Sequence, residues 1–163
     1  MERVAAGDPA AFPALFARHE GPVYRYLLRQ GYDPAAAGDL HQETFLRLYR
    51  ARDRYTPGRP FRPYLYTIAR NAARDAGRRL RRSPEDPLPA ELPHGDAPRP
   101  DASLHLAGLL RQMPETLRDA FLLGAVEGLD HNEVAEVLGI SAVNARARIS
   151  RGRAWLRDAL GAP

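Results

Sequence analysis

The sequence of 163 residues contains neither cysteine nor lysine, so all 24 of its Lys+Arg residues are arginines. The lack of cysteine excludes disulfides, thiolate metal sites and cysteine nucleophiles, and it fits a reducing compartment. The lack of lysine excludes a phosphate-loop lysine, a Schiff base and a lysine general base. The chain also has no apolar run of about 18 residues and no signal-like N-terminus, so we expect a cytoplasmic protein without membrane insertion.

Catalytic side chains are equally scarce. The five histidines are scattered along the chain as His19, His41, His94, His105 and His131. His41 and Glu43 have the spacing of the histidine–glutamate pair of zinc deaminases, but the cysteines that would complete that site are missing. No nucleophile has a candidate base nearby in the sequence. We therefore expect a protein that is not an enzyme and that uses no metal and no cofactor.

Positive charge is concentrated in two blocks. Residues 1–82 contain 16 arginines and eight acids, residues 83–101 contain one arginine and five acids, and residues 102–163 contain seven of each. Within the last stretch, residues 141–163 hold five arginines and only one acid. Separate basic blocks are typical of proteins that bind a polyanion such as nucleic acid, although solvated arginine faces are also common.

The acidic stretch 83–101 separates two domains. It contains six of the 15 prolines and no apolar periodicity, which indicates an extended linker. Apolar residues recur at helical spacing on both sides of it. We therefore predict an all-α protein with two small helical domains, 1–82 and 102–163.

The first domain is predicted to contain four helices. Asp8-Pro9 and Asp33-Pro34 each place a capping carboxylate before a proline at the first helical position. We expect the first helix after Asp8, a second from about Gly21-Pro22 and a third over 34–54. A face of the third helix that is separate from its apolar side consists of Asp39, Gln42, Glu43 and Leu46. This face is either a solvated flank or a docking surface for a basic partner helix.

The segment RPFRPYLYTIARNAARDAGRRLRR (59–82) is the most informative part of the first domain. Leu65, Ile68 and Ala72 follow helical spacing and predict a buried stripe. The opposite side of the helix holds Tyr66, Arg70, Arg74, Arg78 and Arg81, with Asn71 at its margin. Arginines four residues apart repel each other unless an anion lies along them. A nucleic-acid backbone would supply that anion; the alternative is an ordinary arginine-rich surface helix.

Aromatic rings alternate with arginines at the start of this segment. The interleaved residues are Arg52, Arg54, Tyr55, Arg59, Phe61, Arg62, Tyr64 and Tyr66. Exposed rings beside guanidinium groups form a platform on which unstacked bases can stack. Each ring can instead belong to the core, and the sequence leaves these two possibilities open.

The second domain has the pattern of a helix-turn-helix. Asp130 and Glu133 have capping-box spacing, Gly139 permits a tight turn, and Ser141 can cap the next helix. The outward side of that helix carries Arg146, Ser150, Arg153 and Arg157, with Arg148 and Arg151 toward its flanks. Such a basic second helix is shaped for a DNA major groove. The alternative is a small helical bundle with a basic outer helix.

Taken together and in this order, these segments resemble a sigma-70-family RNA polymerase sigma factor of the compact extracytoplasmic-function (ECF) group. DLHQETFLRLYRAR (39–52) is similar to the family segment that grips core polymerase. FRPYLYTIARNAARD (61–75) resembles the segment that melts and reads the −10 element. MPETLRDAFLL (113–123) and GLDHNEVAEVLGIS (128–141) resemble the domain that reads the −35 element. The resemblance implies that 1–82 is like sigma region 2 and 102–163 like region 4.

The resemblance also implies roles for individual residues. The contacts with core polymerase would be Asp39, Gln42, Glu43 and Leu46. The residues that bind and melt the −10 element would be Tyr55, Arg59, Phe61, Arg62, Tyr64, Tyr66, Arg70, Asn71, Arg74 and Arg78. The residues at the −35 element would be Ser141, Asn144, Arg146, Arg148, Ser150, Arg151 and Arg153. The implied partners are core RNA polymerase (the clamp helices of its largest subunit, and its flap), promoter DNA as duplex and as non-template single strand, and an anti-sigma factor.

One alternative function competes with this interpretation. A helix-turn-helix regulator that binds duplex DNA, without acting as a polymerase subunit, would explain residues 102–163. It would not explain the arginines and aromatic rings of residues 59–82. A scaffold or adaptor would explain neither basic face. Binding to core polymerase separates these possibilities.

Overall fold

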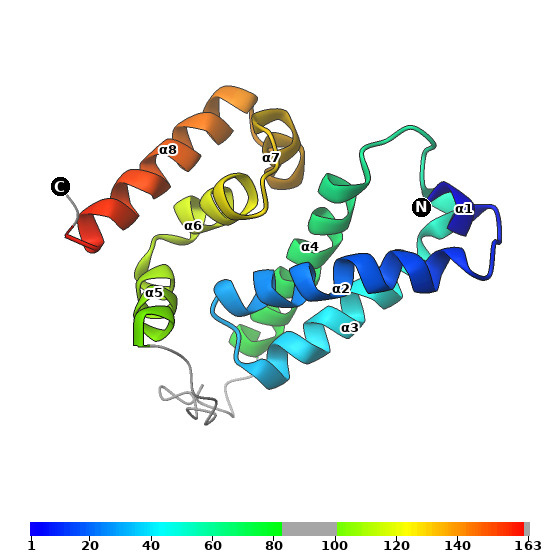
Figure 1. Cartoon of the computed structure of the whole chain (residues 1–163), viewed down its shortest axis with the longest axis horizontal. Helices are drawn as coiled ribbons and strands as arrows, with labels where there is room; N and C mark the ends of the chain where they lie inside the picture. Colours follow the sequence, from blue (N-terminus) through cyan, green and yellow to red (C-terminus); the bar gives the residue numbers. More distant parts are fainter. Residues whose placement is uncertain (83–100, 162–163) are drawn as a thin grey trace.

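Helices form most of the chain that the computed structural model describes, which comprises residues 1–82 and 101–161 (Figure 1). No strand occurs among these residues, in agreement with the all-α prediction. The predicted linker lies outside the described residues except for Asp101, which begins a helix.

The N-terminal part contains four α-helices and one 3-10 turn. These are α1 (Glu2–Ala5), α2 (Ala11–Arg29), α3 (Pro34–Arg50), η1 (Arg52–Arg54) and α4 (Phe61–Arg82). Helices α2, α3 and α4 pack on one another. Their shared core includes Val23, Leu27, Leu48, Leu65 and Ala69, all of which are fully buried.

Helix α2 differs from the prediction of two helices that meet near Gly21-Pro22. It is continuous from Ala11 to Arg29 and contains Pro22. A proline inside a helix costs about 3 kcal/mol, but apolar residues at helical spacing continue across it, from Phe16 to Val23 and Tyr26, and pack into the core. This packing offsets the cost of the proline. The helix also begins later than predicted: its N-cap is Ala10, and the Asp8 carboxylate accepts from the Ala10 amide at 2.9 Å without being the N-cap.

Helix α3 begins as predicted and ends early. The Asp33 side chain accepts from the Ala36 amide at 2.8 Å, with Pro34 in the first turn. The predicted helix over 34–54 stops at Arg50, and its last residues form the separate 3-10 turn η1.

The C-terminal part contains the predicted helix-turn-helix. Its elements are α5 (Asp101–Gln112), α6 (Glu115–Phe121), the π-helical segment η2 (Leu122–Val126), α7 (His131–Leu138) and α8 (Ala142–Ala159). Both halves of the capping box between Asp130 and Glu133 are present, and Gly139 has a φ of 66° in the turn after α7. Ser141 caps α8 by accepting from the Asn144 amide at 3.2 Å. These local predictions are confirmed.

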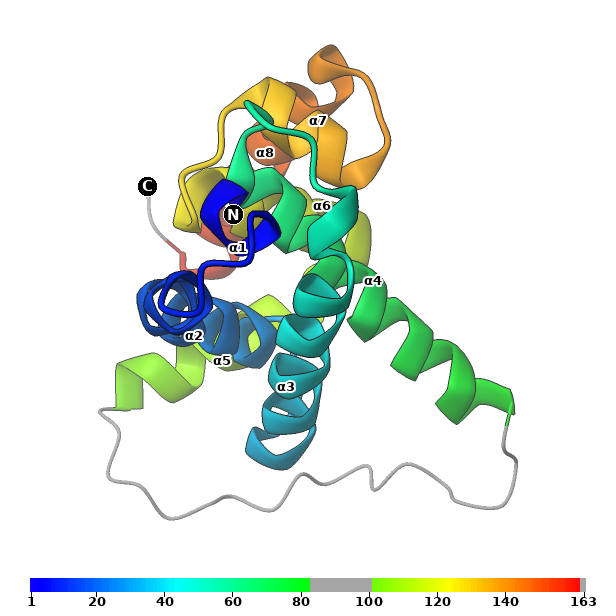
Figure 2. The same ribbon diagram turned by 90° about the vertical axis from the view of Figure 1, so that its right-hand side faces the viewer.

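The two parts of the chain pack against each other. Helix α7 lies on α4, and α5 lies on α2 (Figures 1 and 2). Buried apolar residues from both parts form one contiguous cluster. Among the helices of residues 1–82 and 101–161, none combines the length and the apolar character that crossing a membrane requires.

Candidate functional site

The polar face of α3 is accessible as predicted. Asp39, Gln42 and Leu46 are exposed, and Leu46 retains 43% of its surface in solvent. Glu43 is half-buried, and its carboxylate accepts from Arg47 at 2.7 Å. All four residues therefore lie on one helix. Because they are three or four positions apart, their side chains are neighbours on its surface.

The loop before α4 holds its aromatic residues in a packed cluster. Tyr55 is buried, and its hydroxyl donates to the Arg59 carbonyl oxygen. The Tyr64 ring lies 5.2 Å from the Tyr55 ring, and the Arg59 guanidinium lies 4.8 Å above Tyr64. Phe61 also packs edge-on against Tyr55, at 6.5 Å. Tyr55 is thus a core residue, while Phe61 and Tyr64 are half-buried.

The arginine side of α4 is only partly exposed. This corrects the expected exposure of Arg70, and it places Tyr66, for which the sequence left core and surface open, in the core. Tyr66 is buried, and the Arg70 side chain retains only 17% of its exposure. The C-terminal part covers both: the Tyr66 hydroxyl donates to Glu127 Oε2 at 2.6 Å, and Arg70 Nε donates to Asp119 Oδ2 at 2.9 Å. Burial raises the pKa of Tyr66, and so does its hydrogen bond to the Glu127 carboxylate.

The remaining predicted residues of α4 face solvent. Asn71, Arg74 and Arg78 are exposed. Arg78 pairs with Asp75, and the same carboxylate accepts from Arg47 Nη1 at 2.8 Å.

The predicted DNA-reading side of α8 is open. Ser141, Asn144, Arg146, Ser150, Arg151 and Arg153 are exposed, and Arg148 is half-buried. Ala145, Ile149 and Gly152 are buried on the opposite side. Arg146 and Arg153 have no ion-pair partner within the described ranges, so their guanidinium groups are free to meet phosphate or base edges.

Three acids of the C-terminal part were not recognised from the sequence, although they contact the predicted −10 residues. Asp119, Glu127 and Glu136 lie in or after α6, η2 and α7. Arg59 donates to Glu136 Oε1 at 2.6 Å, and Arg62 donates to the Glu127 carbonyl oxygen. The only hint in the sequence is that the acids of residues 102–163 lie mostly before the basic recognition helix.

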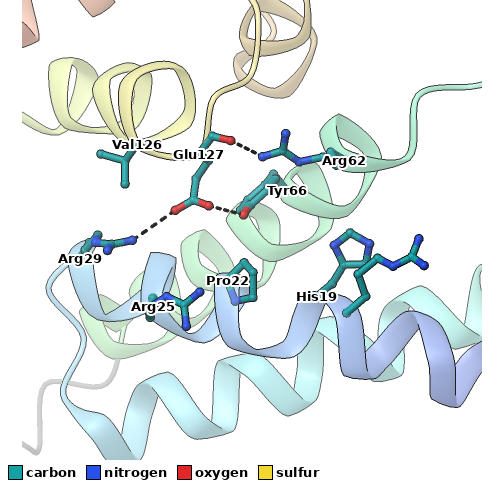
Figure 3. Close-up of a pocket in the computed structure, with 9 residues that line it drawn as sticks. His19, Pro22, Arg25, Arg29, Arg62, Tyr66, Val126 and Glu127 are labelled. Atoms are coloured by element: carbon teal, nitrogen blue, oxygen red, sulfur yellow. Dashed lines mark hydrogen bonds and ion pairs between the residues drawn. The ribbon is translucent and has the colours of Figure 1, made fainter.

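A cavity of about 420 Å³ lies beside Glu127, between the two parts (Figure 3). It is lined by Arg18, His19, Pro22, Arg25, Arg29, Arg62, Tyr66, Val126 and Glu127. Arg29 Nη1 lies 3.4 Å from Glu127 Oε1. Burial lowers the pKa of His19, and the charges of Arg18 and Arg62 lower it further. One carboxylate is thus held among several cationic groups.

A helix-turn-helix with a free basic face, packed on a second helical unit with its own arginine-rich helix, defines a DNA-binding protein of the helix-turn-helix class. Two family models match the chain: "Sigma-70 region 2" over residues 15–83, and "Sigma-70, region 4" over residues 104–156.

Known proteins resemble nearly the whole chain. It is 42% identical to the RNA polymerase sigma factor CarQ of Myxococcus xanthus, over 99% of this chain and 95% of the relative. It is 36% identical to the ECF RNA polymerase sigma factor SigE of Mycolicibacterium smegmatis, over 96% of this chain and 65% of the relative. A solved structure of CnrH in complex with the cytosolic domain of CnrY matches with a TM-score of 0.77 and 30% identity, covering 98% of this chain and 93% of that one.

The chain therefore belongs to the sigma-70 family and is an RNA polymerase sigma factor of the ECF group. This result favours the polymerase subunit over the free-standing helix-turn-helix regulator.

Proposed function

We propose that the two helical domains divide the promoter between them. In this proposal the domain 1–82 binds and melts the −10 element. The residues that do so are Arg59, Arg62, Arg70, Asn71, Arg74 and Arg78, together with the rings of Tyr55, Phe61, Tyr64 and Tyr66. The domain 102–163 holds the −35 element with the outward side of α8. The α3 face of Asp39, Gln42, Glu43 and Leu46 binds core polymerase.

The observation that carries this proposal is the free cationic side of α8. Exposed arginines with no acidic partner keep most of their hydration and side-chain freedom when the protein folds. When they neutralise DNA phosphates, the counterions condensed on the DNA are released. Arg146 and Arg153 fulfil this condition, because both are exposed and neither is ion-paired in the described part of the chain.

Two further points belong to the proposal. The protein acts by binding alone, in the cytoplasm where bacterial polymerase works, and it catalyses no step itself. An anti-sigma factor is a further partner, because the similar protein CnrH is complexed with the cytosolic domain of CnrY.

Run-off transcription with sigma-free core polymerase, this chain and a promoter library tests the proposal. We expect selective initiation, loss of the −35 footprint for Arg146→Ala and Arg153→Ala, and loss of permanganate-reactive bases for the triple variant Arg70→Ala/Arg74→Ala/Arg78→Ala. Arg111→Ala is the control, because Arg111 is exposed on α5, outside all three surfaces. Wild-type footprints and reactivity in all these variants would refute the residue assignments.

A further inference from the structure

The cavity between the two parts gathers more positive charge than its one carboxylate can balance. The cationic side chains of its lining are Arg18, Arg25 and Arg29 from α2 and Arg62 from α4. The carboxylate is that of Glu127, and both of its oxygens are engaged (Figure 3). The Tyr66 hydroxyl donates to Oε2 at 2.6 Å, and Arg29 Nη1 lies 3.4 Å from Oε1. The other three arginines are therefore left without an acid of their own.

These three guanidinium groups are available to an anion from outside. Arg18, Arg25 and Arg62 are exposed. None of them forms an ion pair within residues 1–82 and 101–161, and Arg62 donates only to an uncharged acceptor, the Glu127 carbonyl oxygen, among the contacts between the two parts. Arg25 and Arg29 are four residues apart on one face of α2, so their like charges repel each other unless an anion lies between them.

The wall that α2 contributes to the cavity contains the helix-breaking pair Gly21-Pro22, for which the proposed function gives no role. Pro22 lines the cavity, and a Cβ on Gly21 would lie 3.1 Å from Arg25 Nη1. The Arg25 guanidinium thus folds back over Gly21, where a larger residue would crowd it. Glycine and proline are the two least favourable residues inside a helix. Departures of this kind from local preference are expected at functional sites.

The imidazole of His19 lies in the positive field of the cavity. Burial lowers the pKa of His19, and the charges of Arg18, Arg62 and the N-terminal amine lower it further. The carboxylate of Glu127 lines the same cavity, but its charge is met by Arg29. An anion that entered would favour the imidazolium form, because an opposite charge nearby stabilises the charged state of a group.

The size and lining of the cavity favour a particular class of anion. A guanidinium group binds the oxygens of phosphate as a planar fork, and two linked phosphates offer oxygens to several forks at once. The volume of about 420 Å³ falls within the range of small-molecule sites, roughly 300–1,000 Å³. Pro22 and Val126 give the lining an apolar portion beside the arginines.

We infer that this cavity is a binding site for a diphosphate group, held by Arg18, Arg25 and Arg62. The group belongs either to free pyrophosphate or to a nucleoside diphosphate, whose remaining atoms lie against Pro22 and Val126. The inference goes beyond the proposed function, which uses Arg62 at the −10 element and gives no role to the two arginines of α2.

Isothermal titration calorimetry of the full chain tests the inference, with inorganic pyrophosphate and adenosine diphosphate as the probes. The cavity variant is Arg18→Gln/Arg25→Gln, which removes two exposed and unpaired guanidinium groups and so leaves the fold intact. The control is Arg111→Gln/Arg157→Gln, because these two arginines are exposed outside the cavity. The two variants have the same net charge, so a general loss of attraction to anions affects both equally.

We expect saturable binding of at least one probe by the wild type and the control, and at least about tenfold weaker binding by the cavity variant. Tighter binding of pyrophosphate assigns the site to the free anion, and tighter binding of adenosine diphosphate assigns it to the nucleotide. Equal affinities in the two variants overturn the inference, and so does a wild-type chain that binds neither probe. If the cavity variant then loses affinity for a single-stranded oligonucleotide, the arginines serve nucleic acid instead.

The His19 ring provides a second measurement, which locates the anion. Its imidazole proton signals are identified by their loss in His19→Gln and are followed by NMR as the pH is changed. The bound probe should raise the pKa of His19, because the added negative charge favours the imidazolium. The signals of His131, which is exposed on α7, should be unaffected by the probe. Binding that leaves His19 unchanged would place the anion elsewhere and overturn the inference.

Discussion

Asp75 connects two helices through one carboxylate. It accepts from Arg47 of α3 at 2.8 Å and from Arg78 of its own helix α4. The hydrogen bond from Arg47, followed by that from Arg78, holds the pKa of Asp75 below its usual value. A carboxyl whose pKa is lower in the folded state stabilises the fold above its unfolded pKa, about 3.9 for aspartate, and this stabilisation is lost as the pH falls through the folded pKa.

We therefore expect Asp75→Asn to lower the free energy of unfolding at pH 7 by at most about 1 kcal/mol, because the pairs are a third exposed and screened by water. The difference from wild type should begin to shrink below about pH 4 and should vanish below the lowered folded-state pKa, where the wild-type carboxyl is neutral too. Urea unfolding at pH 7 and pH 3 measures both values. Asp53→Asn is the control, since Asp53 is exposed and its carboxylate lies as far as 3.9 Å from Arg52 Nε, which makes a weak ion pair. A loss of equal size at both pH values would contradict this explanation.

Side-chain roles were predictable where the partner is close in sequence. The caps formed by Asp33, Asp130 and Ser141 bind amides two or three residues away, so the sequence alone specifies them. Arg70 was predicted on an exposed side, and the sequence left open whether Tyr66 belongs to the core or to the surface. Their partners lie 49 and 61 residues away. No local pattern reports such contacts, because they depend on how two folded units meet.

Helices α6 and α8 approach closely at Gly152. A Cβ at this position would lie 2.9 Å from Phe121 Cβ and 3.2 Å from the Leu117 carbonyl oxygen. The carbonyl belongs to the backbone of α6 and cannot rotate away. Gly152→Ala should therefore destabilise the protein by about 1–3 kcal/mol, as overpacking does, despite the better helix propensity of alanine.

Gly108→Ala on α5 is the matched control, because nothing lies within 4 Å of its Cβ position. There alanine should stabilise the protein by up to about 1 kcal/mol, the difference in helix propensity. Thermal and urea unfolding of both variants measure the two effects. The same sign of change at both glycines would show that the α6–α8 contact is not as close as described.

Helix boundaries were predictable only where they carry a chemical stop signal. Gly139 and the capping box fix the ends of α7, and both were predicted. Gly21-Pro22 has equally strong breaker residues, yet α2 continues through it. The reason is packing. Helix α2 buries one side against α3 and α4, and this burial stabilises the helix more than the helix-breaking preference of Gly21-Pro22 destabilises it.

Besides the shared apolar cluster, exposed and buried ion pairs link the two parts of the chain. Arg59–Glu136 is about 40% exposed on both sides, whereas Asp119 and Glu127 are buried. Exposed pairs weaken as the Debye length falls from about 10 Å at 0.1 M salt to 3 Å at 1 M, and buried pairs are screened much less. The radius of gyration should therefore depend on salt only in a variant that lacks the buried ion pairs.

We expect the free wild-type chain to keep a radius of gyration near 15 Å, the value for a compact chain of this length, from low salt to 1 M. Of the ion pairs described between the two parts, the variant Asp119→Asn/Glu127→Gln retains only the exposed pair Arg59–Glu136, so its radius should increase as salt is added. Small-angle scattering across a salt series measures the response, and the control Glu115→Gln/Asp158→Asn, which removes two exposed acids, should behave as wild type. Expansion of the wild-type chain with salt would mean that exposed pairs alone hold the domains together, because screening acts on them and leaves the Arg70–Asp119 pair largely intact.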